Sequence, residues 1–224
     1  MRATVPLAAL ALALAAAAPV RAAPAAATPD PEAHYQSLLA AAKAADPGIE
    51  GWRDLRYAYA KTPAYSPEGA GEGKMRMLQA FRSGDCQATL AAARTIGEID
   101  YVEPDAHLIS SVCLDKLGQD AAAKHELGVG MGLITSIETT GDGLSAAHAM
   151  TVITVDEEYS VLRALNRPPL RQALVRDGGH SYDVMTTKGD KGGEVTYFFL
   201  IDGVMAAEAA ELAPGAVSEG GPPR

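Results

Sequence analysis

The hydrophobic positions of this chain follow helical periods through its first two thirds and short, strand-like runs in its last third. Apolar side chains at i, i+3, i+4 and i+7 are typical of the buried face of an amphipathic helix. The first such stripe consists of Tyr35, Leu38, Leu39 and Ala42. Asp30 followed by Pro31 is a helix-start signal, and Asp46-Pro47-Gly48 ends the run, so the pattern predicts a first helix between them.

Two further helices are expected before residue 83. The first has one apolar stripe, made of Trp52, Leu55 and Tyr59. The second runs over about residues 72–82, and its spacing predicts a buried face made of Met75, Leu78 and Phe81.

A helical hairpin follows, with one helix over residues 86–99, a returning helix over 105–117 and a further helix over 120–138. Gly84 and Gly118 lie 34 residues apart, as do Ala88 and Ala122. That offset is the tetratricopeptide period, but such arrays need about three repeats to bury a core. Two interpretations stay open, a tetratricopeptide-like array and a generic helical hairpin, and the short match favours the generic hairpin.

Strand-like runs dominate the chain after the turn at residues 140–143. The β-branched run 150–155 predicts a strand, and Thr154 with Glu157 is a capping-box signature for a helix reaching about Leu165. Three strands are then expected over residues 170–176, 181–187 and 194–201. Their short connections allow only an antiparallel meander. The predicted class is α+β, with a helical-hairpin layer followed by a small β-meander.

The two ends of the chain differ from the middle. Residues 1–22 combine an N-terminal Arg2, an alanine-rich apolar run and an Ala-x-Ala-like exit, as in a secretory signal peptide. Residues 23–31 are expected to be a disordered linker and 205–224 a flexible tail. Between them, a helical region at 32–140 and an α+β region at 141–204 are expected to form one compact domain. A periplasmic or secreted location follows from the leader.

Composition and charge exclude some classes of binding partner. The 28 acidic and 19 basic side chains give a net charge of −9. A chain with this balance and no basic stripe is not suited to bind nucleic acid, and anionic lipid surfaces would repel it once the leader is removed. Cys86 and Cys113 lie at the same end of the predicted hairpin, so in an oxidising compartment they are expected to form a disulfide. The cysteine spacing and isolated histidines predict no metal site, and no motif indicates a cofactor.

Seven residues are candidates for a binding or catalytic site, but each also has a structural explanation. Gly143-x-Ser145 weakly resembles a nucleophile elbow, although a turn rather than a strand precedes the serine. Adjacent glutamates point to different sides of a helix and suit its first turn. Asp142 could ligate calcium, but it lies in a glycine-rich turn without an acidic series around it. The full set is Asp142, Ser145, Glu157, Glu158, Tyr159, His180 and Asp183.

Several short motifs in a fixed order resemble one bacterial family of exported proteins, the family of domains of unknown function numbered 4919. The motifs are Asp54-Leu55-Arg56-x-x-Tyr59, Tyr65-x-Pro67, Gly141-Asp142-Gly143-x-Ser145, Glu157-Glu158-Tyr159-x-x-Leu162, Tyr182-Asp183-Val184, Tyr197-Phe198 and Ile201-Asp202. They extend from about Trp52 to Asp202. The resemblance implies export and a layout of helices followed by strands, and it implies no activity.

The leading functional hypothesis from sequence is therefore a non-enzymatic envelope protein that binds a protein or peptide partner through its helical layer. The alternative is a hydrolase or small-ligand enzyme whose site lies where the helices meet the sheet. A third hypothesis places a calcium or cell-wall site at the glycine-rich turns. No catalytic residue is assigned.

Overall fold

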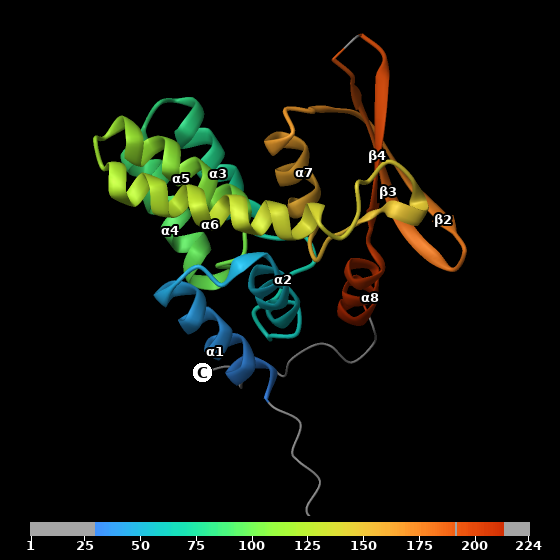
Figure 1. The fold of residues 1–224 in the computed structure, drawn as a ribbon, viewed down its shortest axis with the longest axis horizontal. Helices are drawn as coiled ribbons and strands as arrows, with labels where there is room; N and C mark the ends of the chain where they lie inside the picture. The colour runs from blue at the N-terminus through green and yellow to red at the C-terminus, as the bar shows by residue number, and fades with distance from the viewer. Residues whose placement is uncertain (1–29, 191, 213–224) are drawn as a thin grey trace, which may run out of the picture.

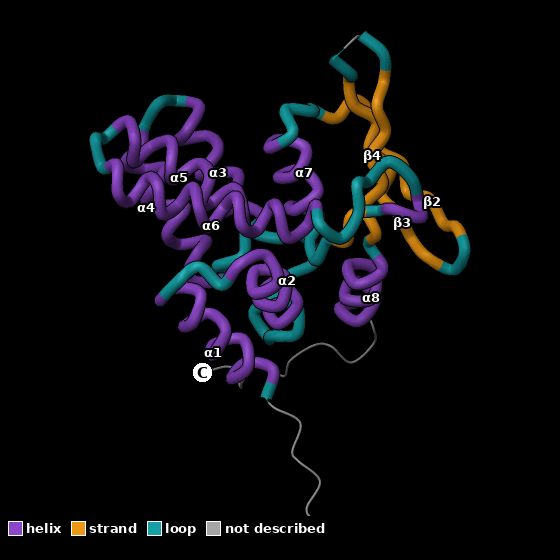
Figure 2. Tube along the Cα trace, viewed as in Figure 1, coloured by secondary structure: helices purple, strands orange, loops and turns teal. Residues whose placement is uncertain are grey.

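The computed structural model describes residues 30–190 and 192–212. The predicted leader at 1–22 and most of the predicted linker lie outside the described residues. Six helices form a layer, a seventh lies between this layer and a small sheet, and an eighth lies at one end of the sheet (Figure 1; Figure 2). The predicted α+β class, helices first and sheet last, is confirmed.

The helical layer contains the predicted helices with small changes at their ends. They are α1 (Pro31–Ala44), α2 (Gly48–Tyr59), α3 (Gly71–Arg82), α4 (Cys86–Ile99), α5 (Pro104–Lys116) and α6 (Asp120–Glu138). Asp30 caps α1 by accepting a hydrogen bond from the Glu32 amide, which confirms the start signal. The α2 stripe of Trp52, Leu55 and Tyr59 is buried as predicted.

The buried face of α3 differs from the prediction. Met75 is 63% exposed, whereas Met77 and Lys74 are buried. Leu78 and Phe81 pack partly buried against the core, so the face is Lys74, Met77, Leu78 and Phe81. The prediction was wrong for Met75, because buried carboxylates hold Lys74 inside and so turn the buried face of the helix away from Met75.

Helix α5 packs between α4 and α6. The predicted disulfide between Cys86 and Cys113 joins the start of α4 to α5, with the Cα atoms 5.1 Å apart. Gly130 and Gly132 on α6 allow close packing, because a Cβ on Gly130 would lie 2.7 Å from Leu108 and one on Gly132 would overlap Trp52. The tetratricopeptide interpretation stays a prediction.

The sheet has four strands in the order β1-β4-β3-β2. The strands are β1 (Met150–Thr151), β2 (Pro169–Asp177), β3 (His180–Lys188) and β4 (Glu194–Leu200). The last three form the predicted antiparallel meander, and Gly178 and Gly179, both with positive φ, make the tight turn between β2 and β3. The run predicted as a strand over 150–155 is shorter, and it pairs in parallel with β4, so the sheet is mixed. It ends early because Thr154 caps α7 (Val155–Ala164), where its hydroxyl accepts from the Glu157 amide.

A shared hydrophobic cluster joins the helical layer to the sheet. Ile134 and Ile137 of α6 pack with Val161 and Leu162 of α7 and with Met185 and Phe199 of the sheet. Helix α8 (Asp202–Glu211) adds Val204 to this cluster and crosses the tail boundary expected at residue 205. Residues 213–224 lie outside the described residues. Within the described ranges, no helix combines the length and apolar character needed to cross a membrane.

Candidate functional site

The seven residues singled out from sequence lie in three different places. Asp142 and Ser145 belong to one surface turn, where the Asp142 carboxylate accepts a hydrogen bond from the Leu144 amide. His180, at the exposed start of β3, pairs through Nδ1 with Asp202 at 2.5 Å. The other four, Glu157, Glu158, Tyr159 and Asp183, lie where α7 meets the helices and the sheet, which is where the enzyme hypothesis placed a site.

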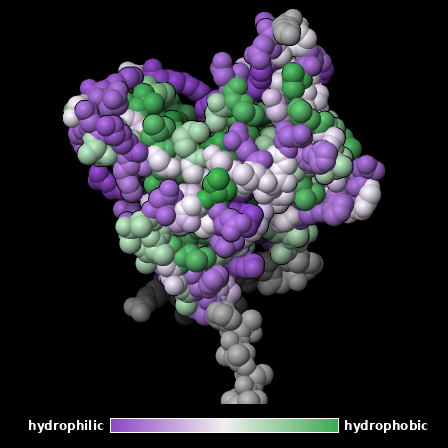
Figure 3. Space-filling view, in the orientation of Figure 1, coloured by the Kyte–Doolittle hydropathy of each residue, from purple (hydrophilic) through white to green (hydrophobic). Residues whose placement is uncertain are grey.

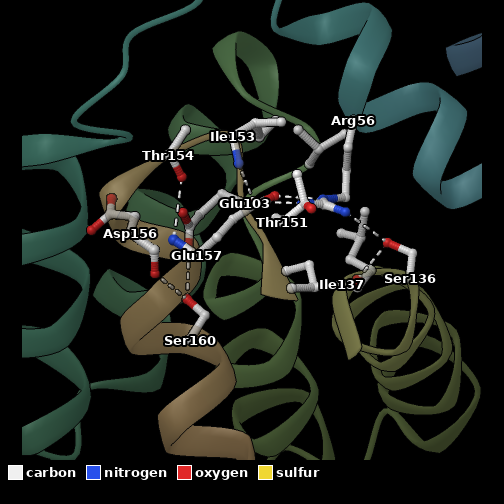
Figure 4. Close-up of polar contacts among 12 residues, drawn as sticks. Arg56, Glu103, Ser136, Ile137, Thr151, Ile153, Thr154, Asp156, Glu157 and Ser160 are labelled. Atoms are coloured by element: carbon white, nitrogen blue, oxygen red, sulfur yellow. Dashed lines mark hydrogen bonds and ion pairs between the residues drawn. The ribbon is translucent and has the colours of Figure 1, made fainter. Parts of the chain in front are cut away.

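Glu157 forms a buried ion pair with Arg56 of α2 (Figure 4). Arg56 Nε and Nη2 each donate to one carboxylate oxygen of Glu157 at 2.6 Å. The same guanidinium donates to Ser136 Oγ at 3.3 Å and to the Thr151 carbonyl at 3.2 Å, while the Ile153 amide donates to Glu157. Each guanidinium nitrogen and both carboxylate oxygens have a hydrogen-bond partner, so this pair fixes α2, α6, β1 and α7 together.

A second buried cluster surrounds Lys74 of α3. Its ammonium lies 3.0 Å from Glu103, 2.9 Å from Asp105 and 3.2 Å from Asp156. Ser160 of α7 donates to Asp105 at 2.9 Å, and Arg163 binds Asp105 through two nitrogens. Figure 4 shows Ser160 and Asp156 beside Glu103 at the start of α7.

The pKa values in this cluster follow from burial and charge. Burial disfavours the Lys74 ammonium, but the three carboxylates outweigh it and raise the pKa of Lys74. Burial raises the pKa of Glu103 to about 7, despite the opposing effect of Lys74. For Asp105, Arg163 and Lys74 overcome burial and lower the pKa. Glu103 Oε2 has no hydrogen-bond partner among the described residues, so no donor on that oxygen offsets the effect of burial.

Glu158 points instead toward the sheet. It is fully buried, and neither carboxyl oxygen has a hydrogen-bond partner within the described chain. Burial, reinforced by the neighbouring Asp183, raises the pKa of Glu158 to about 9, so the side chain is protonated at neutral pH. Asp183 accepts from Gln172 Nε2 at 2.6 Å, and Gln172 Oε1 accepts from the Tyr159 hydroxyl at 2.8 Å. A proton on Glu158 removes the repulsion between two adjacent carboxylates.

Most of the polar groups at this junction are buried, and Tyr159 is half-buried. Four surface cavities have volumes between about 260 and 560 Å³, and none of them is lined by any of the seven residues. Within residues 30–190 and 192–212, no group of three or more His, Cys, Asp or Glu side chains is arranged to hold a metal ion. Glu158, Tyr159 and Asp183 are brought together, but no cavity among these four gives a substrate access to them.

Sequence reasoning gave no role to Arg56 and Lys74, which organise these clusters. The sequence positions of both residues indicate burial. Arg56 follows Trp52 by four residues and lies on the apolar stripe of α2, and Lys74 precedes Met77 and Leu78 at i+3 and i+4. A charged residue on a buried stripe requires a partner, because an unpaired charge is costly to bury.

The largest of the four cavities, about 560 Å³, is a groove on the helical layer. Helices α4 and α6 form its walls and α5 forms its floor. Its lining combines small, apolar and hydrogen-bonding side chains: Lys43, Gln87, Leu90, Ala91, Ala93, Arg94, Gly97, Glu98, Tyr101, Ala106, His107, Ser110, Leu114, Gln119, Ala122 and Glu126. We refer to these residues as the α4–α6 groove.

Both ends of the α4–α6 groove are held in place. Gln87 and Leu114 directly follow the two disulfide-bonded cysteines. At the other end, His107 Nδ1 lies 2.6 Å from Glu126 and His107 Nε2 lies 2.8 Å from the Tyr101 carbonyl. Lys43 Nζ lies 4.8 Å from the centre of the Tyr101 ring. The groove is therefore preformed, with an aromatic ring and opposite charges at one end.

Comparison with family models identifies the chain. The model of the domain of unknown function DUF4919 matches residues 27–208. The chain belongs to the DUF4919 family. The comparisons with curated proteins and with solved structures found no match. The sequence match places this protein in the DUF4919 family, whose function is unknown. Its function is therefore inferred from the chemistry of its surfaces.

Proposed function

We propose that this DUF4919 protein is an exported, non-enzymatic binding protein that holds a peptide or protein segment in the α4–α6 groove. The observation that carries the proposal is the preformed groove itself, about 560 Å³ in volume, on the helical layer. That volume lies within the range of roughly 300–1,000 Å³ that is usual for ligand sites.

The lining of the groove suits a peptide better than a compact metabolite. Small side chains such as Ala91, Gly97 and Ala122 allow a chain to approach the helices closely. Between them, Gln87, Arg94 and Gln119 offer donors and acceptors spaced along the groove, as the repeating amide groups of an extended segment require. A groove held by a disulfide also reduces the ordering cost of binding.

Export is part of the same proposal. The disulfide between Cys86 and Cys113 agrees with an oxidising compartment, which the leader-like residues 1–22 also favour. Mass spectrometry of the protein isolated from its host should place the N-terminus near Ala23. A protein that retains Met1 would contradict cleavage of the leader.

Peptide selection tests the binding proposal. Random peptides displayed on phage are selected on the wild-type protein, and the affinity of the best peptides is measured by fluorescence polarisation. Ala122→Trp fills the groove and should weaken binding about tenfold or more, because the peptide and the indole compete for one volume. The matched control is Ala121→Trp, one position along α6 at an exposed residue outside the groove lining, and it should bind as the wild type does.

Two outcomes would overturn the groove as a peptide site. One is a selection that returns no peptide with measurable affinity for the wild-type protein. The other is equal affinity of the selected peptides for Ala122→Trp and for the wild type.

A further inference from the structure

The outer edge of β2 is nine residues long and is unpaired among the described residues. Among the described residues, β2 pairs only with β3, and it lies at the right-hand border of the molecule in Figure 1, away from the helical layer. All nine of its residues are exposed, including Leu170, Leu174 and Val175 at 55%, 53% and 38%. Proteins usually protect such edges, because an unpaired row of amide and carbonyl groups accepts another strand.

The backbone of β2 is disturbed only at its beginning, although Arg171, Arg176 and Asp177 add charge along the edge. Pro169 and the register shift between Pro169 and Arg171 disturb only the first residues. From Arg171 to Asp177 the strand pairs with β3 without interruption. Seven consecutive residues therefore present a regular, unused edge.

Hydrophobic side chains elsewhere on the visible surface do not form a comparable feature. On the face drawn in Figure 3 they are scattered among polar side chains over the helical layer and the sheet. The edge of β2 thus differs from the rest of this surface because it combines unpaired backbone groups with exposed apolar side chains.

The charges on this strand are complementary to the same strand in reverse. In antiparallel pairing, opposed residues either both point their backbone groups at the partner or both point them away. A symmetric pair of strands must therefore cross at a residue. When two β2 strands cross at Leu174, Arg171 faces Asp177 of the other copy, and this ion pair forms twice.

The other contacts of that register are compatible as well. Leu174 faces its own copy, Ala173 faces Val175, and Gln172 faces Arg176. Crossing at Ala173 instead sets Arg171 against Val175, and crossing at Val175 sets Leu174 against Arg176. Only the crossing at Leu174 pairs Arg171 with Asp177 and uses the whole regular segment, while Arg176 faces the neutral Gln172.

Arg171 is already held in position for such a contact. Its Nη1 lies 3.0 Å from Glu194 Oε1, and the guanidinium has further donors available. Asp177 forms no ion pair with any residue in the described ranges. In the dimer, Arg171 would thus bind Asp177 of the other copy in addition to Glu194 of its own chain. Asp177 would then have an ion-pair partner.

We propose that two copies of this protein associate through antiparallel pairing of their β2 strands, crossing at Leu174, to form one continuous sheet across the dimer. The occupant of the edge is a second copy of the chain, because the charge order of β2 is self-complementary in this register. The contact is isologous and closes after two copies, so it ends the exposed edge without building a fibre.

Cysteine cross-linking tests the register directly. The chain has two cysteines, both in the disulfide, so a new thiol is the only free one. Leu174→Cys places two cysteine Cα atoms about 5 Å apart across the symmetry axis, within the range of a disulfide, and should give a cross-linked dimer under mild oxidation. Gln172→Cys on the same face is the matched control, because its copy lies about 13 Å away along the strand, and it should stay uncross-linked.

Charge reversal tests the affinity. Sedimentation equilibrium of the full chain should show a dimer in the micromolar range, and Asp177→Arg should weaken it about tenfold or more by setting arginine against arginine. The double variant Arg171→Asp with Asp177→Arg restores opposite charges and should recover the dimer. A monomeric wild-type protein, an unchanged Asp177→Arg dimer, or equal cross-linking at Gln172 and Leu174 would each overturn the proposal.

Discussion

Single buried charges in this protein decide how its elements pack. Arg56 and Lys74 each lie on an apolar helical stripe, yet each reaches carboxylates on other helices. Glu158 differs, since no basic side chain in the described part of the chain pairs with it and burial keeps it neutral. The contrast shows two ways of burying a carboxyl group, by pairing it and by protonating it.

Protonation of Glu158 makes stability depend on pH. Its folded-state pKa is about 9 and its ordinary value is 4.5, so the folded protein binds the proton more tightly than the unfolded chain. The contribution is fully present below about pH 4.5 and is lost as the pH rises toward 9. We expect Glu158→Gln, which keeps a neutral donor beside Asp183, to remove this loss.

The measurement is the free energy of unfolding from urea titrations between pH 4.5 and 9. Glu158→Gln should match the wild type near pH 4.5 and exceed it by on the order of 3 kcal/mol at pH 7. Glu68→Gln, at an exposed residue before α3, serves as the control and should show no such trend. Parallel pH profiles of the wild type and Glu158→Gln would contradict a protonated Glu158.

At the scale of elements, the α4–α5 hairpin is held by both a helix cap and a disulfide. Asp85 caps α4 by accepting from the Ala88 amide, and the disulfide ties the start of α4 to α5. These two helices also form a wall and the floor of the α4–α6 groove. The disulfide thus stabilises the same hairpin that forms part of the proposed binding groove.

Removal of the disulfide should lower stability without changing the fold. The bridge spans a sequence separation of 27 residues, for which loop-closure entropy corresponds to about 3.5 kcal/mol. The double variant Cys86→Ala with Cys113→Ala should lose this amount in urea titrations. Reduction of the wild-type protein should give the same loss and leave the double variant unchanged. Equal stability of the oxidised wild type and the double variant would show that the bridge contributes nothing.

At the scale of the whole molecule, the helical layer and the sheet share one core. Arg56 of α2 holds Glu157 of α7, and Ile134 and Ile137 of α6 pack against Met185 and Phe199 of the sheet. Because these contacts cross from one layer to the other, we expect the two layers to unfold in a single transition.

Two probes can compare the layers during unfolding. The single tryptophan, Trp52, reports on the helical layer through its fluorescence. Hydrogen exchange of peptides from β3 and β4, followed by mass spectrometry, reports on the sheet. The two midpoints in urea should coincide. Exchange of the sheet at a clearly lower urea concentration would show that it unfolds by itself.

Local patterns in the sequence determined most of the elements and the disulfide. Apolar periodicity placed the helices, the Gly178-Gly179 turn set the meander, and the hairpin geometry brought Cys86 and Cys113 to one end. These features depend on residues close in sequence or on one helical hairpin, so the sequence alone was sufficient for them.

Only the tertiary structure decided the burial of Lys74, the partners of Arg56, the parallel pairing of β1 with β4, and the protonation of Glu158 beside Asp183. Each of these joins segments far apart in the chain; Arg56 and Glu157, for example, are 101 residues apart. The charge state of a side chain and its partners depend on the residues around it in space. The periodicity of one helix or strand does not show which residues of other elements those are.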